Sequence, residues 1–231
     1  MKLNYSQLNT DFWQKGFCII DDLFPADLLI QWKHMIEYLS EYSEATGVNH
    51  IQKEFKEANK EIGDAAGKYR FTSLDGRILF QDNLFPGLQE YYSSHANFLS
   101  LLLGLDVVTS EDKQSSISVM RYAPPGGELL YHYDQNFPSF VLYLTDNPNE
   151  GATRLYPITS LKSTVLGEPD KIIGESVAIY PKKGRVLIFN GAKCWHASEK
   201  VEKDTKISIV FNFFQNGINN RSNEVSNRLY Q

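Results

Sequence analysis

Cysteine is scarce in this sequence, and its scarcity excludes two classes of small protein. Cys18 and Cys194 are the only cysteines among 231 residues. Two cysteines are too few for a scaffold held by disulfides, and these two lack the paired spacing of a structural zinc site. We therefore expect a protein of a reducing compartment, with Cys18 as a small buried hydrophobic residue rather than a reactive thiol.

Long hydrophobic runs and an excess of positive charge are also missing. Residues 1–16 contain no apolar segment of signal-peptide length, and no run approaches the roughly 18 apolar residues that a membrane span needs. The formal net charge is -5, which gives no general attraction to a phosphate backbone. These absences predict a soluble cytoplasmic protein whose partner is neither a membrane nor a nucleic acid.

The sequence contains enough apolar residues for one substantial core, since 42% of its residues are hydrophobic. We expect a single domain over residues 1–231, with mostly helical support over residues 1–115. Pro25 stands at a favourable first helical position, and apolar residues then recur at helical spacing, namely Leu28, Trp32, Met35, Ile36 and Leu39. A second helix is expected from Pro86 to Gly104, where the glycine would end it.

Short runs rich in Val, Ile, Tyr and Phe fill residues 116–215 and alternate with clusters of Gly, Pro, Asn and Asp. Such a series of short strands predicts an antiparallel sandwich or jelly roll, so the expected fold class is mainly β with flanking helices. Residues 159–175 form a polar insertion in the series, and residues 216–231 form a polar tail. Residues 43–69 are also polar, and their pattern leaves a solvated helix, a loop and a mobile lid open as alternatives.

The five histidines separate into two groups by their neighbours. His34, His50 and His95 fall in the helical half with no partner at ligand spacing, so we expect ordinary surface or capping residues. His132 and Asp134 lie two residues apart in a strand-like run, where alternation turns both side chains to the same face.

One metal ion could contact both His132 and Asp134, and His196 on a later strand would complete a set of two imidazoles and one carboxylate. This set leaves the opposite coordination positions open, which suits an Fe(II) ion that must hold a bidentate cosubstrate and dioxygen together. A His-x-Asp pair alone is weak evidence, because a barrel-facing histidine can equally be a hydrogen-bonded core residue.

Lys206 opens the run KISIVFNFF ten residues after His196. Alternation divides this run into two faces, with Lys206, Ser208, Val210 and Asn212 on one and Ile207, Ile209, Phe211 and Phe213 on the other. A lysine in an apolar strand is costly unless its ammonium binds an anion, and the distal carboxylate of a keto acid is such an anion. The Ser208 hydroxyl could donate a second hydrogen bond. In the alternative interpretation, Lys206 begins an edge strand and points to solvent.

Three blocks of sequence resemble the catalytic core of the 2-oxoglutarate-dependent dioxygenases, closest in pattern to the prolyl 4-hydroxylase-like branch. They are SVMRYAPPGGELLYHYD, FVLYLTDNPNEGATRLYP and PKKGRVLIFNGAKCWHASEKVEKDTKISIVFNF, within residues 116–215. The resemblance implies a double-stranded β-helix, a jelly-roll core, with Fe(II) bound by His132, Asp134 and His196. It also implies that a basic residue near the last core strand binds 2-oxoglutarate, and Lys206 matches the lysine form of the collagen-type prolyl hydroxylases.

The resemblance extends to two tyrosines, since members of this branch contact the cosubstrate at the positions of Tyr122 and Tyr143. Either could instead be a packed strand aromatic. Two positions depart from the family pattern. Gly151-Ala152 stands in place of a usual Gly-Gly, and Asn212 in place of a common aromatic residue. Asn212 suggests a more polar substrate side of the pocket, which argues against a prolyl peptide.

The implied cofactors are Fe(II), 2-oxoglutarate and O2, with ascorbate as an additional candidate, and the implied reaction oxidises a C–H bond while releasing succinate and CO2. Asp134 favours hydroxylation over halogenation, because halogenases of the family carry a small residue in place of this carboxylate. Desaturation, epoxidation and ring formation use the same ligands and stay open. Nucleic-acid demethylases of the family carry a second arginine shortly after the basic residue, whereas the next arginine after Lys206 is Arg221.

Three functions are candidates. We favour oxidation of a small molecule, such as an amino acid or a biosynthetic intermediate, because the chain is short and shows no peptide-binding module or repeat. A peptidyl or protein hydroxylase comes second. The third, a non-catalytic jelly-roll module that binds a metal or ligand, is disfavoured because structural zinc sites normally have four protein ligands. Gln135 and Asn212 are candidate substrate contacts, although each could be a turn or packing residue.

Overall fold

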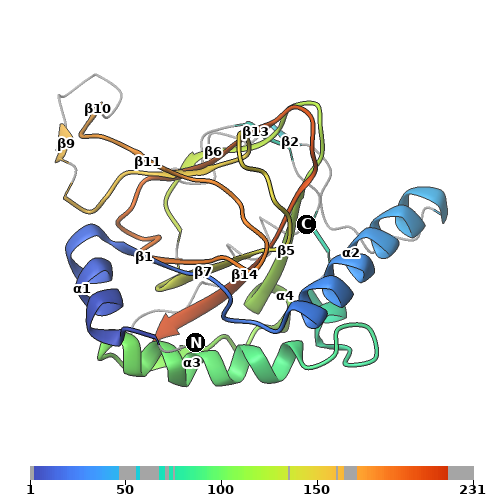
Figure 1. Cartoon of the computed structure of the whole chain (residues 1–231), viewed down its shortest axis with the longest axis horizontal. Helices are drawn as coiled ribbons and strands as arrows, with labels where there is room; N and C mark the ends of the chain where they lie inside the picture. The colour runs from blue at the N-terminus through green and yellow to red at the C-terminus, as the bar shows by residue number, and fades with distance from the viewer. Residues whose placement is uncertain are drawn as a thin grey trace.

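The computed structural model describes residues 3–46, 56–57, 68–70, 73–74, 76–134, 136–159, 161–163 and 171–217. Two β-sheets face each other, and helices cover the outer side of one of them (Figure 1). The arrangement is a double-stranded β-helix, so the predicted fold class, mainly β with flanking helices, is confirmed.

The first helix, α1 (Tyr5–Lys15), is an element that the sequence analysis did not single out. The Asn4 side chain caps its start by accepting a hydrogen bond from the Gln7 backbone N–H at 3.1 Å. Gly16 ends it with a φ of 88°, a left-handed conformation that glycine adopts without steric cost. Two shorter helical elements are η1 (Gly76–Phe80) and α4 (Lys113–Ser116).

Both predicted helices are present, as α2 (Ala26–Thr46) and α3 (Leu88–Leu103). The first starts directly after Pro25, and the second ends at Gly104, as expected from the sequence. Trp32 of α2 is fully buried, and its indole N–H donates to the Pro86 carbonyl at 3.1 Å. This bond ties α2 to the segment that leads into α3.

The major sheet carries the helices. In spatial order it contains β1 (Phe17–Ile20), β12 (Val186–Phe189), β7 (Ser139–Tyr143), β14 (Lys206–Gln215) and β4 (Val107–Thr109), and β5 (Ile117–Tyr122) also pairs with β14. Lys206 pairs with Tyr122 of β5, and from Ser208 onward β14 has β7 on its other side. Because β14 lies inside the sheet and Lys206 is only 2% exposed, the edge-strand alternative for Lys206 is wrong.

The minor sheet faces the major one. It contains β11 (Val177–Ile179), β8 (Thr153–Leu155), β13 (His196–Val201), β6 (Gly127–His132), β3 (Lys68–Arg70) and β2 (Lys56–Glu57). The last two strands fall in the polar segment 43–69, and most of that segment, with the lid suggested for it, lies outside the described residues. The polar insertion 159–175 contains a short antiparallel pair, β9 (Leu161–Ser163) and β10 (Lys171–Ile173).

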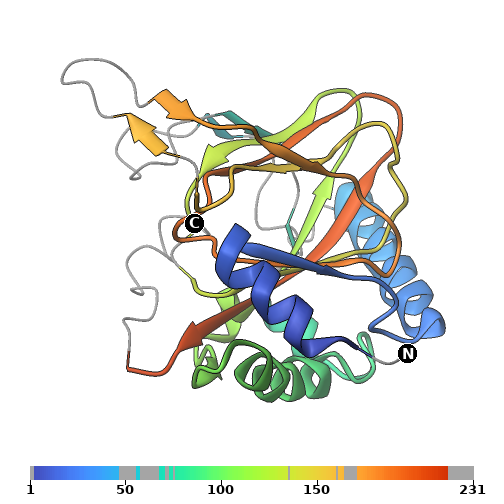
Figure 2. The same ribbon diagram turned by 60° about the vertical axis from the view of Figure 1, so that its left-hand side comes forward.

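Strand β14 separates the two apolar regions of the molecule. Its residues Ile207, Ile209, Phe211 and Phe213 are buried in the large core between the major sheet and the helices. Figure 2 shows α1 and α3 on this outer side of the sheet. The opposite face of β14 turns toward the minor sheet, where Val210 packs against a smaller apolar cluster that includes Tyr143, Leu155 and Phe189. The predicted division of this run into two faces is therefore confirmed, and Lys206 points into the barrel.

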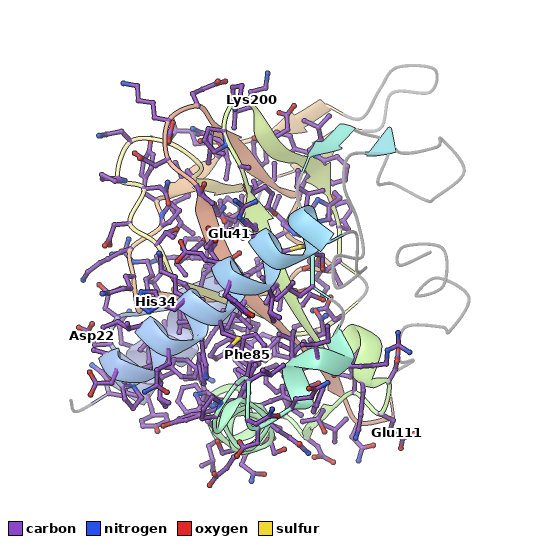
Figure 3. The ribbon with its side chains drawn as sticks, turned by 90° about the vertical axis from the view of Figure 1, so that its right-hand side faces the viewer. Asp22, His34, Glu41, Phe85, Glu111 and Lys200 are labelled. Carbon is purple, nitrogen blue, oxygen red and sulfur yellow. The ribbon has the colours of Figure 1, made fainter. Side chains whose placement is uncertain are left out.

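His95 lies in the core, so its prediction as a surface or capping residue is wrong. It is 9% exposed and its ring stacks on Phe24, with centroids 4.9 Å apart. Its Nδ1 lies 2.6 Å from the Tyr91 carbonyl oxygen, and burial lowers its pKa. His34 is exposed on the outer side of α2, as predicted (Figure 3). His50 lies outside the described residues.

Both cysteines are buried, and burial raises the pKa of each thiol to about 12. The prediction that Cys18 is an unreactive buried residue is confirmed. In the described part of the chain, no helix combines the length and the apolar character that crossing a membrane requires.

Candidate metal and cosubstrate site

The three predicted metal ligands converge between β6 and β13. His132 ends β6, His196 begins β13, and the two are direct partners in the antiparallel pairing. Asp134 follows two residues after His132, and its Oδ1 lies 3.4 Å from His132 Nε2 and 3.5 Å from His196 Nε2. One ligand atom from each of the three residues lies within 4.8 Å of the others, and no fourth His, Cys, Asp or Glu of the described residues joins the group.

The hydrogen bonds of the two imidazoles orient their Nε2 atoms toward Asp134. His132 Nδ1 lies 2.8 Å from the Leu130 carbonyl oxygen, and His196 Nδ1 lies 2.9 Å from that of Cys194. A carbonyl oxygen can only accept, so each Nδ1 carries the proton and donates. In the neutral imidazoles the lone pairs therefore reside on Nε2, the atoms that face the carboxylate. Fixing the ring through the other nitrogen is the usual support of a metal-binding histidine.

The charges of the site are coupled. Burial alone would raise the pKa of Asp134, but the attraction of His196 and the closeness of both imidazoles hold this pKa well below its usual range. Burial alone would lower the pKa of His196, and the neighbouring Asp134 carboxylate raises it instead. A ring of Phe189 packs edge-on against His196, with centroids 4.7 Å apart. The site therefore holds a carboxylate that stays ionised at neutral pH against a partly apolar wall.

Lys206 forms a second polar centre inside the same barrel. Its ammonium donates to Ser198 Oγ at 2.8 Å, and it lies 5.0 Å from the ring centroid of Tyr122 and 5.5 Å from that of Tyr143. None of the described carboxylates forms an ion pair with it. Burial lowers the pKa of Lys206 to about 7, with only a weak opposing effect from Glu199. A buried ammonium with a neutral hydroxyl as its hydrogen-bond partner is suited to receiving an anion.

Hydroxyl groups surround this ammonium. Tyr122 shares a hydrogen bond with Ser198, and the Tyr143 hydroxyl donates to Thr153 Oγ1 at 2.7 Å. Thr153 and Ser198 are partners in the pairing of β8 with β13, so they hold this group from the minor sheet. The sequence analysis missed Ser198 and Thr153. For Ser198 a signal existed, because strand alternation from His196 places it on the same face.

Of the remaining predicted site residues, the structure describes Ser208 and Asn212 but not Gln135. Ser208 is 3% exposed and pairs with Tyr143 in the neighbouring strand, on the barrel face of β14 next to Lys206. Asn212 is 6% exposed on the same face, and its backbone carbonyl accepts a hydrogen bond from the Tyr92 hydroxyl at 2.7 Å. Gln135 lies outside the described residues.

Comparison with protein families shows which superfamily the strands of the barrel match. Residues 117–214 match the model of the 2OG-Fe(II) oxygenase superfamily, where 2OG is 2-oxoglutarate. The strand-rich core belongs to this superfamily. All three candidate ligands and Lys206 lie within the matched segment of the oxygenase core. No curated protein sequence gives a match.

Several solved structures share the fold of this chain. A prolyl hydroxylase from Trichoplax adhaerens, in complex with a peptide fragment of a hypoxia-inducible factor, has a TM-score of 0.65 at 16% identity, covering 98% of this chain and 92% of that one. AviO1 from Streptomyces viridochromogenes Tue57 has a TM-score of 0.67 at 12% identity, with coverages of 96% and 100%. SnoN, a non-heme epimerase of nogalamycin biosynthesis, has a TM-score of 0.59 at 13% identity, with coverages of 91% and 83%. At these identities the likeness shows the fold, and the first agrees with the prolyl hydroxylase-like branch that the sequence resembles.

Proposed function

We propose that this chain is an Fe(II)- and 2-oxoglutarate-dependent oxygenase that hydroxylates a C–H bond of a small molecule, such as an amino acid or a biosynthetic intermediate. The observation that carries the proposal is the meeting of His132, Asp134 and His196 around one point, with their nitrogen and oxygen atoms within 4.8 Å. Membership of the superfamily supports the class of reaction.

The donor set fits Fe(II). Two imidazoles and one carboxylate on one side of an ion are the ligands of non-haem Fe(II) oxygenases, whereas a structural zinc site normally has four protein ligands. His132, Asp134 and His196 would hold the ion. When bound, Fe(II) together with O2 and 2-oxoglutarate would supply the oxidising chemistry, with succinate and CO2 as coproducts. The protein's own contribution is to supply a preformed, ionised ligand set and to keep it in a buried barrel.

Lys206 would bind the distal carboxylate of 2-oxoglutarate. Its ammonium has no carboxylate partner among the described residues, and the hydroxyls of Tyr122 and Ser198 stand beside it. Hydrogen bonds from charged donors to a carboxylate are about twice as strong as neutral ones. The arrangement therefore favours a dicarboxylate whose far end reaches Lys206 while its other end faces the metal ligands. We retain Tyr143 and Ser208 as supporting contacts of this pocket.

Hydroxylation is the outcome we favour over halogenation, because Asp134 supplies a carboxylate at the position where halogenases of the family carry a small residue. One of the similar structures, SnoN, is an epimerase, so the fold alone does not select hydroxylation. A peptidyl hydroxylase is the second candidate, since one similar structure is a prolyl hydroxylase that holds a peptide. Asn212 favours the small molecule, because an amide at this buried position suits a polar ligand better than a proline ring. Gln135 stays a weaker candidate for a substrate contact.

A substrate screen tests the proposal. Protein with Fe(II), 2-oxoglutarate and O2 is incubated with a library of amino acids, metabolites and proline-containing peptides, with and without ascorbate, and succinate and products are measured by mass spectrometry. We expect one small molecule to raise succinate release and to gain one oxygen atom. A peptide as the only active compound would favour the second candidate. A wild type that binds metal yet releases no more succinate than Asp134→Ala would favour a non-catalytic binding module.

A further inference from the structure

The two oxygens of the Asp134 carboxylate have different surroundings. Oδ1 faces the Nε2 atoms of His132 and His196 at 3.4 and 3.5 Å. Oδ2 accepts a hydrogen bond of 2.6 Å from the Ser139 hydroxyl. One oxygen is thus directed at the candidate metal position, and the other is engaged by the protein.

The direction of this hydrogen bond is set by a second one. Asn136 Nδ2 donates to Ser139 Oγ at 3.1 Å, so this oxygen already accepts and directs its own hydrogen to Asp134. Both residues are buried, Asn136 at 7% exposure and Ser139 at 0%. The order of donation is therefore Asn136 to Ser139 to Asp134.

The strands fix Ser139 at this place. It is the first residue of β7 and pairs with Phe189 on one side and Asn212 on the other. The backbone of Gly191 lies beside the same pair of residues, and its carbonyl accepts from the Asp134 backbone N–H at 2.9 Å. A Cβ at Gly191 would lie 2.3 Å from Ser139 Oγ and 2.4 Å from Asp134 Oδ2, so this close approach requires glycine. Ser139 and the Gly191 backbone therefore both confine the Oδ2 end of the carboxylate.

We infer that Ser139, supported by Asn136, is a positioning residue that holds Asp134 with a single oxygen toward the metal. This inference rests on the proposed metal site. A carboxylate can bind an ion through one oxygen or through both. Because Ser139 engages Oδ2, Asp134 takes one coordination position instead of two, and the position left open is available to the cosubstrate. Mutating a residue that orients a metal ligand typically weakens metal binding by about 10- to 100-fold.

The test is a titration of the whole protein with Mn(II) and, separately, Co(II), without any turnover. We expect Ser139→Ala to bind Mn(II) about 10- to 100-fold more weakly than the wild type, the range typical for loss of a group that orients a ligand. Asn136→Ala, which leaves the direct bond to Asp134 in place, should weaken binding less, and Ser139→Thr, which keeps a hydroxyl, should restore most of the affinity. The visible absorption of the Co(II) protein should also change in Ser139→Ala, because the freed Oδ2 can turn to the ion.

Ser40→Ala is the matched control. Ser40 is also buried, at 2% exposure, and its hydroxyl donates to the Ile36 carbonyl at 2.7 Å, but it lies in α2 on the outer side of the major sheet. It should lose some stability and keep the Mn(II) affinity and the Co(II) spectrum of the wild type. A folded Ser139→Ala protein that matches the control in both measurements would overturn the positioning role. A wild type that binds neither ion would instead overturn the proposed metal site, and the inference with it.

Discussion

His132 and His196 are direct partners across the antiparallel pairing of β6 and β13, and their ring centroids lie 4.2 Å apart. The pairing register therefore brings together two proposed metal ligands that are far apart in the sequence. Asp134 lies two residues after the end of β6, and this short segment brings its carboxylate close to both imidazoles. A preformed ligand set of this kind predicts that metal binding stabilises the fold.

Metal should raise the stability of the wild type and leave Asp134→Ala unchanged. A ligand that binds only the folded state at 100 times its Kd adds about 2.7 kcal/mol to the free energy of unfolding. We expect a shift of the melting temperature on adding Mn(II) to the wild type, measured by calorimetry. Asp21→Ala is a suitable control for metal binding, because Asp21 pairs with Arg185 and neither residue belongs to the candidate metal group. It should melt lower and keep the full shift, and a shift in Asp134→Ala as large as the wild type's would show that Asp134 is no ligand.

Lys206→Met should separate cosubstrate binding from metal binding. Methionine has a similar length and fills the buried space, but it offers no charge to a carboxylate. Losing one partner of a buried charge pair costs about 2–5 kcal/mol, so we expect 2-oxoglutarate affinity to fall by at least about 30-fold, while Mn(II) affinity stays within a factor of about two. Calorimetric titration measures both. Unchanged affinity for both ligands would remove Lys206 from the pocket.

The affinity for 2-oxoglutarate should fall as pH rises above about 7. In the protein without cosubstrate, burial lowers the pKa of Lys206 to about 7, so the ammonium loses its proton above that pH. Binding a carboxylate there requires the proton to be taken up again, which weakens affinity by up to about tenfold per pH unit. Titrations at several pH values between 6.5 and 8.5 test this. Lys206→Arg, which stays charged, should show a much flatter profile, and an equally flat wild-type profile would contradict the explanation.

The same residue should make stability depend on pH. The pKa of Lys206 is about 7 in the folded state and near its usual 10.5 when unfolded, so between these values the unfolded chain binds more protons. The cost of burying Lys206 is full below pH 7 and shrinks as pH rises toward 10.5, by at most about 1.4 kcal/mol per pH unit. We therefore expect Lys206→Met to be more stable than the wild type at pH 6.5, with a smaller advantage at pH 9. Denaturant unfolding at both pH values measures the difference, which should not grow with pH.

The sequence predicted those parts of the site that lie two residues apart along the chain, where alternation alone places both side chains on one face. His132 with Asp134, and Lys206 with Ser208, are of this kind. The barrel itself followed from the spacing of short strands and turns. Thr153 was missed because its place in this group depends on the pairing of different strands, which no local pattern encodes. Alternation from His196 could have assigned the face of Ser198, but not its contact with Lys206 on another strand. His95 was misjudged for the same reason, since Phe24, which covers it, comes from a distant part of the chain.

Gly151→Ala should weaken 2-oxoglutarate binding as well as stability. Gly151 has a φ of 64°, and a Cβ there would lie 2.7 Å from Val201 Cγ1 and 3.3 Å from Lys206 Cδ. The strained backbone costs about 1–3 kcal/mol, and the added methyl group presses on Lys206, the proposed binding residue for the cosubstrate. Gly104→Ala gives the matched control, because Gly104 has a φ of 67° with no atom within 4 Å of its Cβ. Gly104→Ala should lower the free energy of unfolding by a similar amount while the affinity for 2-oxoglutarate stays unchanged. Equal affinities for 2-oxoglutarate in both variants would contradict the role of Gly151.

The most direct test of the central claim is succinate release from 2-oxoglutarate by purified protein supplied with Fe(II) and O2, without added substrate. We predict slow but measurable release by the wild type and none above background by Asp134→Ala. No release by a wild type that binds Fe(II) and 2-oxoglutarate, or equal release by the variant, would contradict the claim that His132, Asp134 and His196 form the catalytic metal centre.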